Sequence, residues 1–274
     1  MKFVNTKNYS SSIYFDNNYN FFSMVGNDAI SFLDRMSTNN IFDVQSSRTV
    51  ITDNKGSIID ILSYKVIDDK KIIFVSDSDK NKSIEYMKKH VIIDDVELNL
   101  IGKLSKIVIF LEKDKIFPDL HKFTLSNTYK NKNFIRYELF ASNDELRLLE
   151  NSKFKKLSLD EKNILDIHMK YICFNQSMIK ANPLELGFRN MISFDKGCYV
   201  GQEVIARLYN YKKVSREVVP FQTKTELKIN SKIIIESKNI GNILNVQKNS
   251  GNFVGLCLIK KRFTNLISDE ILNI

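Results

Sequence analysis

The chain has 274 residues, of which 43% are hydrophobic and 27% charged, so it can bury a sizeable core, and its composition excludes a disordered protein. The formal net charge of +9 favours anionic partners, although lysines spread along the whole chain are more typical of a solvated surface. The sequence has no apolar run of membrane-spanning length, and its three cysteines are widely spaced. Residues 1–22 lack the charged start and apolar run of a secretory signal, so we expect none. We therefore expect a cytoplasmic protein with reduced thiols and no membrane partner.

The first 102 residues mix helix and strand patterns. Apolar spacing predicts a helix from Asn27, as its cap, to Met36, and a second helix at about 79–89. Turn residues at 53–56 and 68–70 predict two hairpins. The expected strands of this segment are 48–52, 58–66, 71–75, 91–93 and 96–101.

The rest of the chain falls into a second mixed segment, 103–209, and a third segment of short strands, 210–274. In the second segment we expect strands at 106–111 and 134–140, a short helix capped by Asn143, and a helix that a Ser158–Glu161 capping box opens. The third segment predicts a small all-β sheet or barrel. Its expected strands are 214–221, 232–236, 241–246 and 253–259. The sequence thus predicts an α+β body of two subdomains followed by a small β domain.

The stretch from Lys196 to Glu203 reads Lys-Gly-Cys-Tyr-Val-Gly-Gln-Glu and concentrates reactive groups between two glycines. Gly197 and Gly201 permit a positive φ or the close approach of another backbone segment. The stretch follows an apolar run and precedes another, near the junction of the body and the β domain. Because ligand pockets favour such junctions, we expect a site there.

Cys198 is the strongest candidate for chemistry in this stretch. A thiolate forms near positive charge or amide donors, and Lys196 lies two residues away. The residues leave an equal alternative, in which Cys198 is a small buried thiol that packs a turn. No histidine is adjacent, which disfavours a Cys–His hydrolase, and His168 is expected to be a half-buried packing residue. The absence of Cys-x-x-Cys, phosphate-loop and Gly-x-Ser-x-Gly motifs gives no support for a metal, nucleotide or hydrolase site.

Three further side chains are candidates for a ligand site. Glu203 and Arg207 stand four apart, so on a helix they form an ion pair or, alternatively, reach into a pocket with Gln202. Glu185 lies between Pro183 and Gly187, which stiffen its segment and permit a tight turn. Its carboxylate could accept paired hydrogen bonds from an amino-heterocycle, or it could be an ordinary surface residue.

The residues from Ile192 to Arg207, which read I-S-F-D-K-G-C-Y-V-G-Q-E-V-I-A-R, closely resemble the signature of the YgfZ family. These are folate-binding proteins related to the glycine-cleavage T-protein, an aminomethyltransferase. Shorter pieces at 25–29, 38–40, 56–60 and 183–185 also resemble that family. The helix at 166–171 departs from it, because it lacks the family's Arg-x-x-x-Gly pattern.

The resemblance implies a T-protein-like, folate-binding α+β body and a small C-terminal β-barrel. It implies tetrahydrofolate or a derivative as the ligand, and iron–sulfur enzymes or their assembly factors as partners, including enzymes that thiolate tRNA. The family's conserved cysteine falls on Cys198. The other signature positions are Lys196, Gly197, Tyr199, Gly201, Gln202 and Glu203, with Glu185 and Arg207 as the candidate folate contacts.

Two other functions stay open at the level of sequence. The related T-protein suggests a folate-dependent one-carbon transferase, but the cysteine-containing signature favours an accessory protein that is not a stand-alone enzyme. Direct contact with tRNA is the second, because basic residues beside aromatic ones can hold a nucleic-acid backbone and stack its bases. The residues concerned are Lys212, Lys213, Arg216, Tyr209 and Tyr211.

Overall fold

The computed structural model describes residues 11–77, 82–117, 120–149, 152–173 and 180–266. The chain divides into two compact units. The sheet unit comprises Thr6–Lys156 and Asn190–Gln202, and the tail unit comprises Met1–Asn5, Leu157–Arg189 and Glu203–Ile274. The predicted signature stretch therefore crosses from one unit into the other after Gln202.

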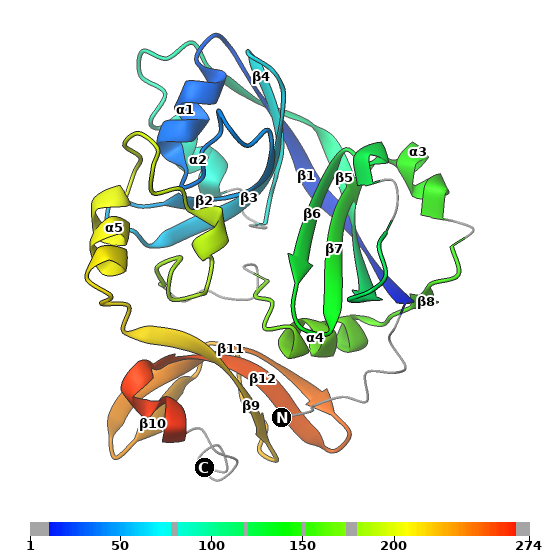
Figure 1. Ribbon diagram of the computed structural model, residues 1–274, viewed down its shortest axis with the longest axis vertical. Helices are drawn as coiled ribbons and strands as arrows, with labels where there is room; N and C mark the ends of the chain where they lie inside the picture. Colours follow the sequence, from blue (N-terminus) through cyan, green and yellow to red (C-terminus); the bar gives the residue numbers. More distant parts are fainter. Residues whose placement is uncertain (1–10, 78–81, 118–119, 150–151, 174–179, 267–274) are drawn as a thin grey trace. The chain divides into compact units, whose positions relative to one another are not determined.

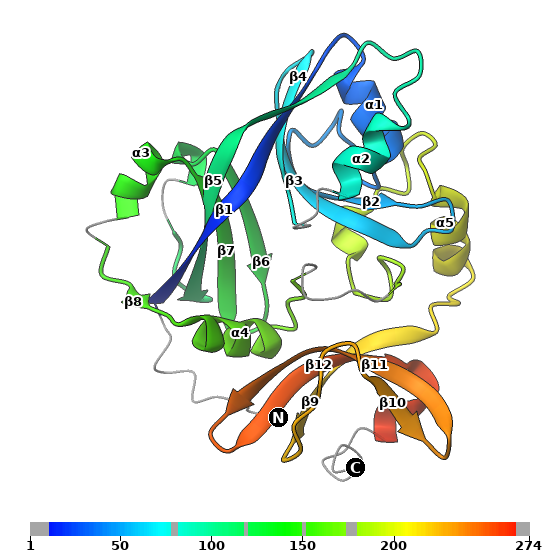
Figure 2. The same cartoon turned by 180° about the vertical axis from the view of Figure 1, so that it is seen from behind.

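The sheet unit is built on one eight-stranded sheet with the order β2-β3-β4-β1-β5-β7-β6, in which β8 pairs with β1. Two long antiparallel strands, β1 (Ser11–Val25) and β5 (Glu97–Glu112), run through the whole unit and join its halves (Figures 1 and 2). The other strands are β2 (Ser46–Thr52), β3 (Ile58–Asp68), β4 (Lys71–Ser76), β6 (Leu125–Lys130), β7 (Phe134–Ala141) and β8 (Lys155–Lys156).

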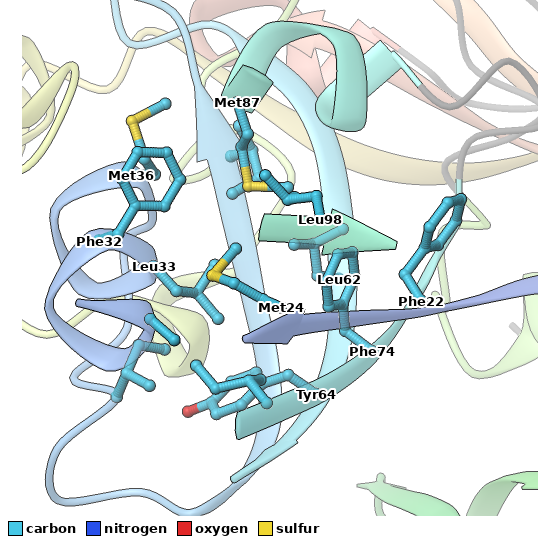
Figure 3. Packing of buried hydrophobic residues seen from close by; sticks show 14 of the residues in the cluster. Phe22, Met24, Phe32, Leu33, Met36, Leu62, Tyr64, Phe74, Met87 and Leu98 are labelled. Carbon is cyan, nitrogen blue, oxygen red and sulfur yellow. The ribbon is translucent and has the colours of Figure 1, made fainter. Parts of the chain in front are cut away.

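Two helices, α1 (Ala29–Met36) and α2 (Lys82–Lys88), supply apolar side chains to one face of the β2-β3-β4-β1 half. Alternate strand residues meet them there, because successive side chains of a strand point to opposite faces. Figure 3 shows Phe32, Leu33 and Met36 of α1 beside Met24 and Met87 in this core. The short helices of the unit are α3 (Asn143–Leu146) and the single turns at Leu120–Lys122 and Arg147–Leu149, and a further turn at Arg189–Met191 crosses from the tail unit into the sheet unit.

The opposite face of the sheet buries a chain of five charged side chains. Arg48 of β2 binds Asp77 at 2.5 Å, and Lys106 of β5 lies 3.6 Å from Asp77 and 3.1 Å from Glu138 of β7. Arg136 completes the chain with a 2.9 Å bond to Glu138. Burial alone would raise the pKa of Glu138, but the charges of Lys106 and Arg136 outweigh it and hold that pKa well below its usual range. Each buried ion needs its partner, because an uncompensated one costs several kcal/mol.

In the described part of the tail unit the α-helices are α4 (Leu159–His168) and α5 (Gln202–Asn210). Helix α5 begins at Gln202, the last residue of the sheet unit. Its antiparallel sheet has the order β10-β11-β12-β9, and α4 packs against β11 and β12. The strands are β9 (Arg216–Thr223), β10 (Lys232–Ile235), β11 (Lys238–Asn249) and β12 (Asn252–Lys260), followed by a turn of 3-10 helix at Lys261–Leu266. The predicted small barrel is not observed, because no pairing joins β10 to β9 within the described residues.

Most of the predicted strands and turns are confirmed, and the differences have local causes. Asp28, not Asn27, precedes α1, while Asn27 donates to the carboxylate of Asp95. Ser142, not Asn143, caps α3. The strand expected at 91–93 is wrong, because those residues form a loop between α2 and β5. The capping box of Ser158 and Glu161 is confirmed at the start of α4.

The strands predicted at 96–101 and 106–111 are one strand, β5. Gly102 has a φ of +152°, and a register shift against β1 lies beside it, so the interruption in the apolar pattern marks a bulge and not an end. The subdomain boundary expected at residue 102 falls inside this strand. The expected subdomain boundaries at residues 102 and 209 therefore stay predictions. The two compact units divide the chain at other places, after residues 156, 189 and 202.

Candidate functional site: a thiol on a locked loop

The loop that carries the signature, residues 190–202, is fixed to the sheet unit through Lys196. The Lys196 ammonium donates to the backbone carbonyl oxygens of Asp34 at 2.5 Å, Asn39 at 2.6 Å and Ser37 at 3.1 Å. It also pairs with the Asp34 carboxylate at 2.9 Å, and its side chain is buried. These acceptors lie at the end of α1, where helix carbonyls lack partners within the helix. Lys196 therefore caps α1 and neutralises the negative end of its dipole.

This arrangement changes the role that the sequence suggested for Lys196. An ammonium has three hydrogens, and four acceptors at the end of α1 surround it. Burial lowers the pKa of Lys196, and the hydrogen bond to Asp34 and its charge oppose that shift. The positive charge of Lys196 thus attaches the loop to the end of α1. The Lys196 ammonium is held by these acceptors and not by the expected pairing with the Cys198 thiol.

The three residues that follow Cys198 attach the other side of the loop to the rest of the sheet unit. Tyr199 is buried, and its ring centroid lies 5.4 Å from the Lys196 ammonium. Val200 donates its N–H to the carbonyl of Arg35 at 3.1 Å and accepts from the Thr52 hydroxyl at 2.6 Å. Gly201 has a φ of +84°, and a Cβ there would lie 2.6 Å from the Asp53 carbonyl oxygen. The close approach predicted for Gly201 is confirmed, whereas Gly197 has open space around it and no positive φ.

Cys198 lies exposed between these two attachments. The alternative of a buried packing thiol is therefore wrong for Cys198. It does describe Cys257, which is buried in the tail unit and whose pKa is raised by burial to about 12. Cys173 is half-buried. Of the three thiols, Cys198 is the one that the fold presents to solvent.

The remaining signature residues lie in α5. Glu203 and Arg207 are on this helix, as predicted, and both are exposed. No ion pair joins them among the described side chains, so the expected i,i+4 pair is not formed. Gln202 begins the helix, and its N–H donates to the Tyr199 carbonyl at 3.1 Å.

Glu185 is held in place in the tail unit, as its sequence predicts, but an arginine holds it. The Arg216 guanidinium donates to both carboxylate oxygens, from Nε at 2.8 Å and from Nη2 at 2.6 Å, in the paired geometry that we had expected of a ligand. The N–H of Asn182 adds a third bond at 3.0 Å. Gly187, with a φ of +78°, makes the predicted tight turn. An ionised carboxylate accepts about four bonds, so one acceptor position of Glu185 remains.

Asp60, which lies in the 56–60 piece and for which the sequence predicts no functional role, is fully buried in β3. Its carboxyl oxygens accept from the Ser76 hydroxyl at 2.5 Å, the Ser83 hydroxyl and the Ile61 N–H at 2.8 Å. Burial raises the pKa of Asp60 to about 7, and the serine hydrogen bonds lower it only in part. The signal that could have revealed this residue is an aspartate inside an otherwise apolar strand, Ile58-Ile59-Asp60-Ile61-Leu62.

The end of α5 presents two tyrosines beside cations. Tyr209 is 43% exposed, and the Arg189 guanidinium lies 4.8 Å from its ring centroid. Tyr211 is 68% exposed, and the Lys213 ammonium lies 5.4 Å from its ring centroid. Arg216, which the sequence grouped with them, is engaged by Glu185.

Two kinds of feature are absent from the described part of the chain. No three His, Cys, Asp or Glu side chains gather there in a way that could hold a metal ion, and His168 is half-buried, as expected. No helix there is long and apolar enough to cross a membrane.

The chain resembles known proteins in sequence and in fold. A scan against protein-family models finds no match. The chain is 23% identical to an aminomethyltransferase of Thermotoga sp. (strain RQ2) over 279 residues, which cover 88% of this chain and 76% of that protein. It is 36% identical to a putative chloroplastic transferase of Arabidopsis thaliana over 83 residues, 30% of this chain and 19% of that protein.

The crystal structure of the glycine cleavage system aminomethyltransferase T from Bartonella henselae superposes with a TM-score of 0.65. The match covers 93% of this chain and 79% of that one, at 12% sequence identity. The chain has a T-protein-like fold. Sequence similarity to aminomethyltransferases agrees with it over most of the chain.

Substitutions can separate two effects on stability at Gly201, that of its close approach to Asp53 and that of its positive φ. Gly201→Ala places a Cβ 2.6 Å from the Asp53 carbonyl oxygen, whereas Gly187→Ala, at a similar φ, meets nothing within 4 Å. We expect Gly187→Ala to cost about 1–2 kcal/mol and Gly201→Ala a further ~1–3 kcal/mol. Urea unfolding measures both, with Gly197→Ala as the unstrained control. Equal losses at 187 and 201 would contradict the close approach.

The raised pKa of Asp60 predicts a pH-dependent stability. The unfolded carboxyl ionises near pH 4 and the folded one near 7, so between these values the unfolded state loses a proton that the folded state keeps. The wild type should therefore lose stability relative to Asp60→Asn by roughly 1.4 kcal/mol per pH unit between about pH 4 and 7, with no further loss above. Denaturant unfolding across this range measures the difference. Asp69→Asn, in the exposed β3–β4 turn, is the control, and parallel profiles for wild type and Asp60→Asn would exclude a raised pKa.

Proposed function

We propose that this protein binds tetrahydrofolate or a derivative and serves the assembly or maintenance of iron–sulfur enzymes, including those that thiolate tRNA. The observation that carries the proposal is an exposed thiol, Cys198, in a loop that is locked on both sides, on a T-protein-like fold. The resemblance of this loop to the YgfZ signature supplies the link to folate and to iron–sulfur enzymes. An accessible thiol can act as a nucleophile or as a soft metal ligand towards a partner.

The candidate folate contacts fit such a ligand in part. Glu185 keeps one acceptor position, enough for a single hydrogen bond from the amino group of a heterocycle, since Arg216 takes the paired geometry. Arg207 is exposed and can pair with a carboxylate such as the glutamate tail of a folate. When bound, a reduced folate would supply amine nitrogens that carry one-carbon units.

Two measurements test the proposal. Titration of the full-length protein with tetrahydrofolate should give saturable binding, and its absence would count against folate as the ligand. In a deletion strain, wild type and Cys198→Ala are compared for the activity of tRNA-thiolating iron–sulfur enzymes. We expect the wild type and the control Cys173→Ala to restore that activity, and Cys198→Ala to fail while it still folds. Full rescue by Cys198→Ala would remove the thiol from the function.

A one-carbon transfer activity is the alternative that the related aminomethyltransferases suggest. The exposed cysteine of the signature loop is the feature that favours the accessory role over it. Formation of methylene-tetrahydrofolate from an aminomethylated carrier protein separates the two functions. Clear turnover would replace the accessory role with the transferase.

The tyrosines at the end of α5 favour a second candidate function, contact with single-stranded RNA. Exposed rings beside cations can stack bases while the cations hold phosphates, and each stacked base contributes about 1–3 kcal/mol. Fluorescence anisotropy with a labelled single-stranded oligoribonucleotide tests it. We expect Tyr211→Ala to weaken binding about 5- to 150-fold, with a clear salt dependence for the wild type. No binding, or binding that salt does not change, would dismiss the candidate, and Phe42→Ala is the exposed aromatic control.

A further inference from the structure

The positive charge of the chain is concentrated in the tail unit. The sheet unit has 24 Lys and Arg residues against 22 Asp and Glu residues, a net charge of +2, whereas the tail unit has 17 against 10, a net charge of +7. Lys and Arg occur at a similar frequency in both units, so a general enrichment in lysine does not explain the difference. Acidic residues are scarce in the tail unit, since residues 237–266 contain five Lys and Arg residues and no Asp or Glu. The tail unit is therefore the part of the chain that favours an anionic partner.

Strand pairing brings six cations to one end of the tail sheet. β12 ends where β9 begins, since Lys260 pairs with Arg216, and β11 begins beside them, because the Lys260 ammonium donates to the Asn239 carbonyl at 2.8 Å. The N–H of Lys261 donates to the Ser215 carbonyl at 2.8 Å, which joins the segment after α5 to the same end. The six cations, which we call the basic end of the tail sheet, are Lys212, Lys213, Lys238, Lys260, Lys261 and Arg262.

The acidic side chains at the basic end do not balance these cations. Glu236 lies in the turn between β10 and β11. Glu217 lies in β9 and accepts from the Thr264 hydroxyl, a hydrogen bond that does not neutralise a carboxylate. Arg216 and Glu185 pair with each other, so their charges cancel. Six cations against the two carboxylates of Glu217 and Glu236 leave an excess of four positive charges.

The six cations are accessible to a partner. Lys260 is half-buried and the other five are exposed, and no ion pair is described for any of them. The two remaining acids of α5 and the described segments that follow it, Glu203 and Glu226, lie at the start of α5 and in the connection between β9 and β10. The turn of 3-10 helix that carries Lys261 and Arg262 lies beside β10 in both views of the chain (Figures 1 and 2).

An exposed aromatic ring adjoins the basic end. Tyr211 is 68% exposed, and its ring centroid lies 5.4 Å from the Lys213 ammonium. An acidic protein or a lipid headgroup needs only the cations of such a surface. An RNA chain also offers bases, which stack on an exposed ring while neighbouring cations hold the phosphates. The combination of Tyr211 with the six cations therefore favours RNA among anionic partners.

We propose that the basic end of the tail sheet binds the phosphate backbone of a structured RNA, and that a tRNA is such a partner. The choice of tRNA rests on the proposed function and on its second candidate, contact with RNA, whereas the anionic character of the partner follows from the charges. The surface extends that candidate from bases stacked on the tyrosines to phosphates held by β11, β12 and the turn after β12. Phosphate contacts carry no sequence information, so different tRNAs should bind with similar affinity.

Fluorescence anisotropy of the full-length protein with a labelled, unmodified tRNA transcript tests the proposal. We expect saturable binding that weakens about 50- to 150-fold between 50 and 200 mM KCl, since about four phosphates release their counterions. Lys261→Gln/Arg262→Gln should bind about 10- to 100-fold more weakly in 50 mM KCl and should halve the slope of log affinity against log salt concentration. Lys261→Arg/Arg262→Lys keeps both charges and should bind like the wild type.

Lys224→Gln/Lys248→Gln is the matched control. It removes two exposed lysines from the opposite end of the same sheet, where Thr223 and Lys248 both pair with Phe253. The net charge of the protein falls by the same amount as in the first variant, yet the affinity and the salt slope should stay close to those of the wild type. Equal losses for the control and the first variant, or no loss for the first variant, would overturn the proposal.

A second variant and two parallel measurements keep the outcomes distinct. Lys213→Gln/Lys238→Gln should show the same loss, and it decides the test if the first variant fails to fold. Vesicles of phosphatidylserine that bind as tightly as tRNA would overturn the proposal in favour of an anionic lipid surface. If no tRNA binds while tetrahydrofolate binding and Cys198-dependent rescue persist, the RNA surface fails and the proposed function stands. If tRNA binds as expected while tetrahydrofolate does not, the RNA surface stands and the proposed folate function fails.

Discussion

The position of the candidate site depends on one buried ammonium. Lys196 reaches the end of α1 across 162 residues of sequence and satisfies carbonyls that the helix leaves without partners. Burying a charge costs several kcal/mol unless strong acceptors surround it, and here three carbonyls and the Asp34 carboxylate do so. The same contact that completes α1 therefore fixes the Cys198 loop. The exposed thiol lies between two buried side chains, those of Lys196 and Tyr199.

Local chemistry was enough to predict most of the elements and part of the site. Alternating apolar residues indicated β2, β3, β4 and β7, and the Asp53–Gly56 turn between two of them follows from its own side-chain and backbone hydrogen bonds. Ser158 and Glu161 defined the start of α4 because a capping box is made within four residues. The sequence predicts a positive φ or a close approach at both Gly197 and Gly201, and the structure has them at Gly201 alone of the two.

What sequence could not provide is the partner of each polar group across long separations. The role of Lys196 depends on carbonyls near residue 34, and the engagement of Glu185 depends on Arg216, 31 residues away. The raised pKa of Asp60 comes from its burial by the fold, and Ser76 and Ser83, which β4 and α2 bring to it, oppose that shift only in part. The sequence predicts two strands where the structure has one, β5. The bulge at Gly102 interrupts the apolar pattern, whereas pairing with β1 keeps the strand continuous.

The order of the chain also determines when the site can form. The sheet unit takes residues up to 156 and then residues 190–202, so its last piece is made after an intervening segment of the tail unit. Contacts of such long sequence separation slow folding, and during synthesis they have to wait for the C-terminal partner to leave the ribosome. Before that, the carbonyl oxygens of Asp34, Ser37 and Asn39 lack Lys196 as their donor, and the Asp53 backbone lacks its contact with Gly201. The thiol loop thus acts as a closing segment: a chain that displays Cys198 in its fixed position is one whose sheet unit has already been completed.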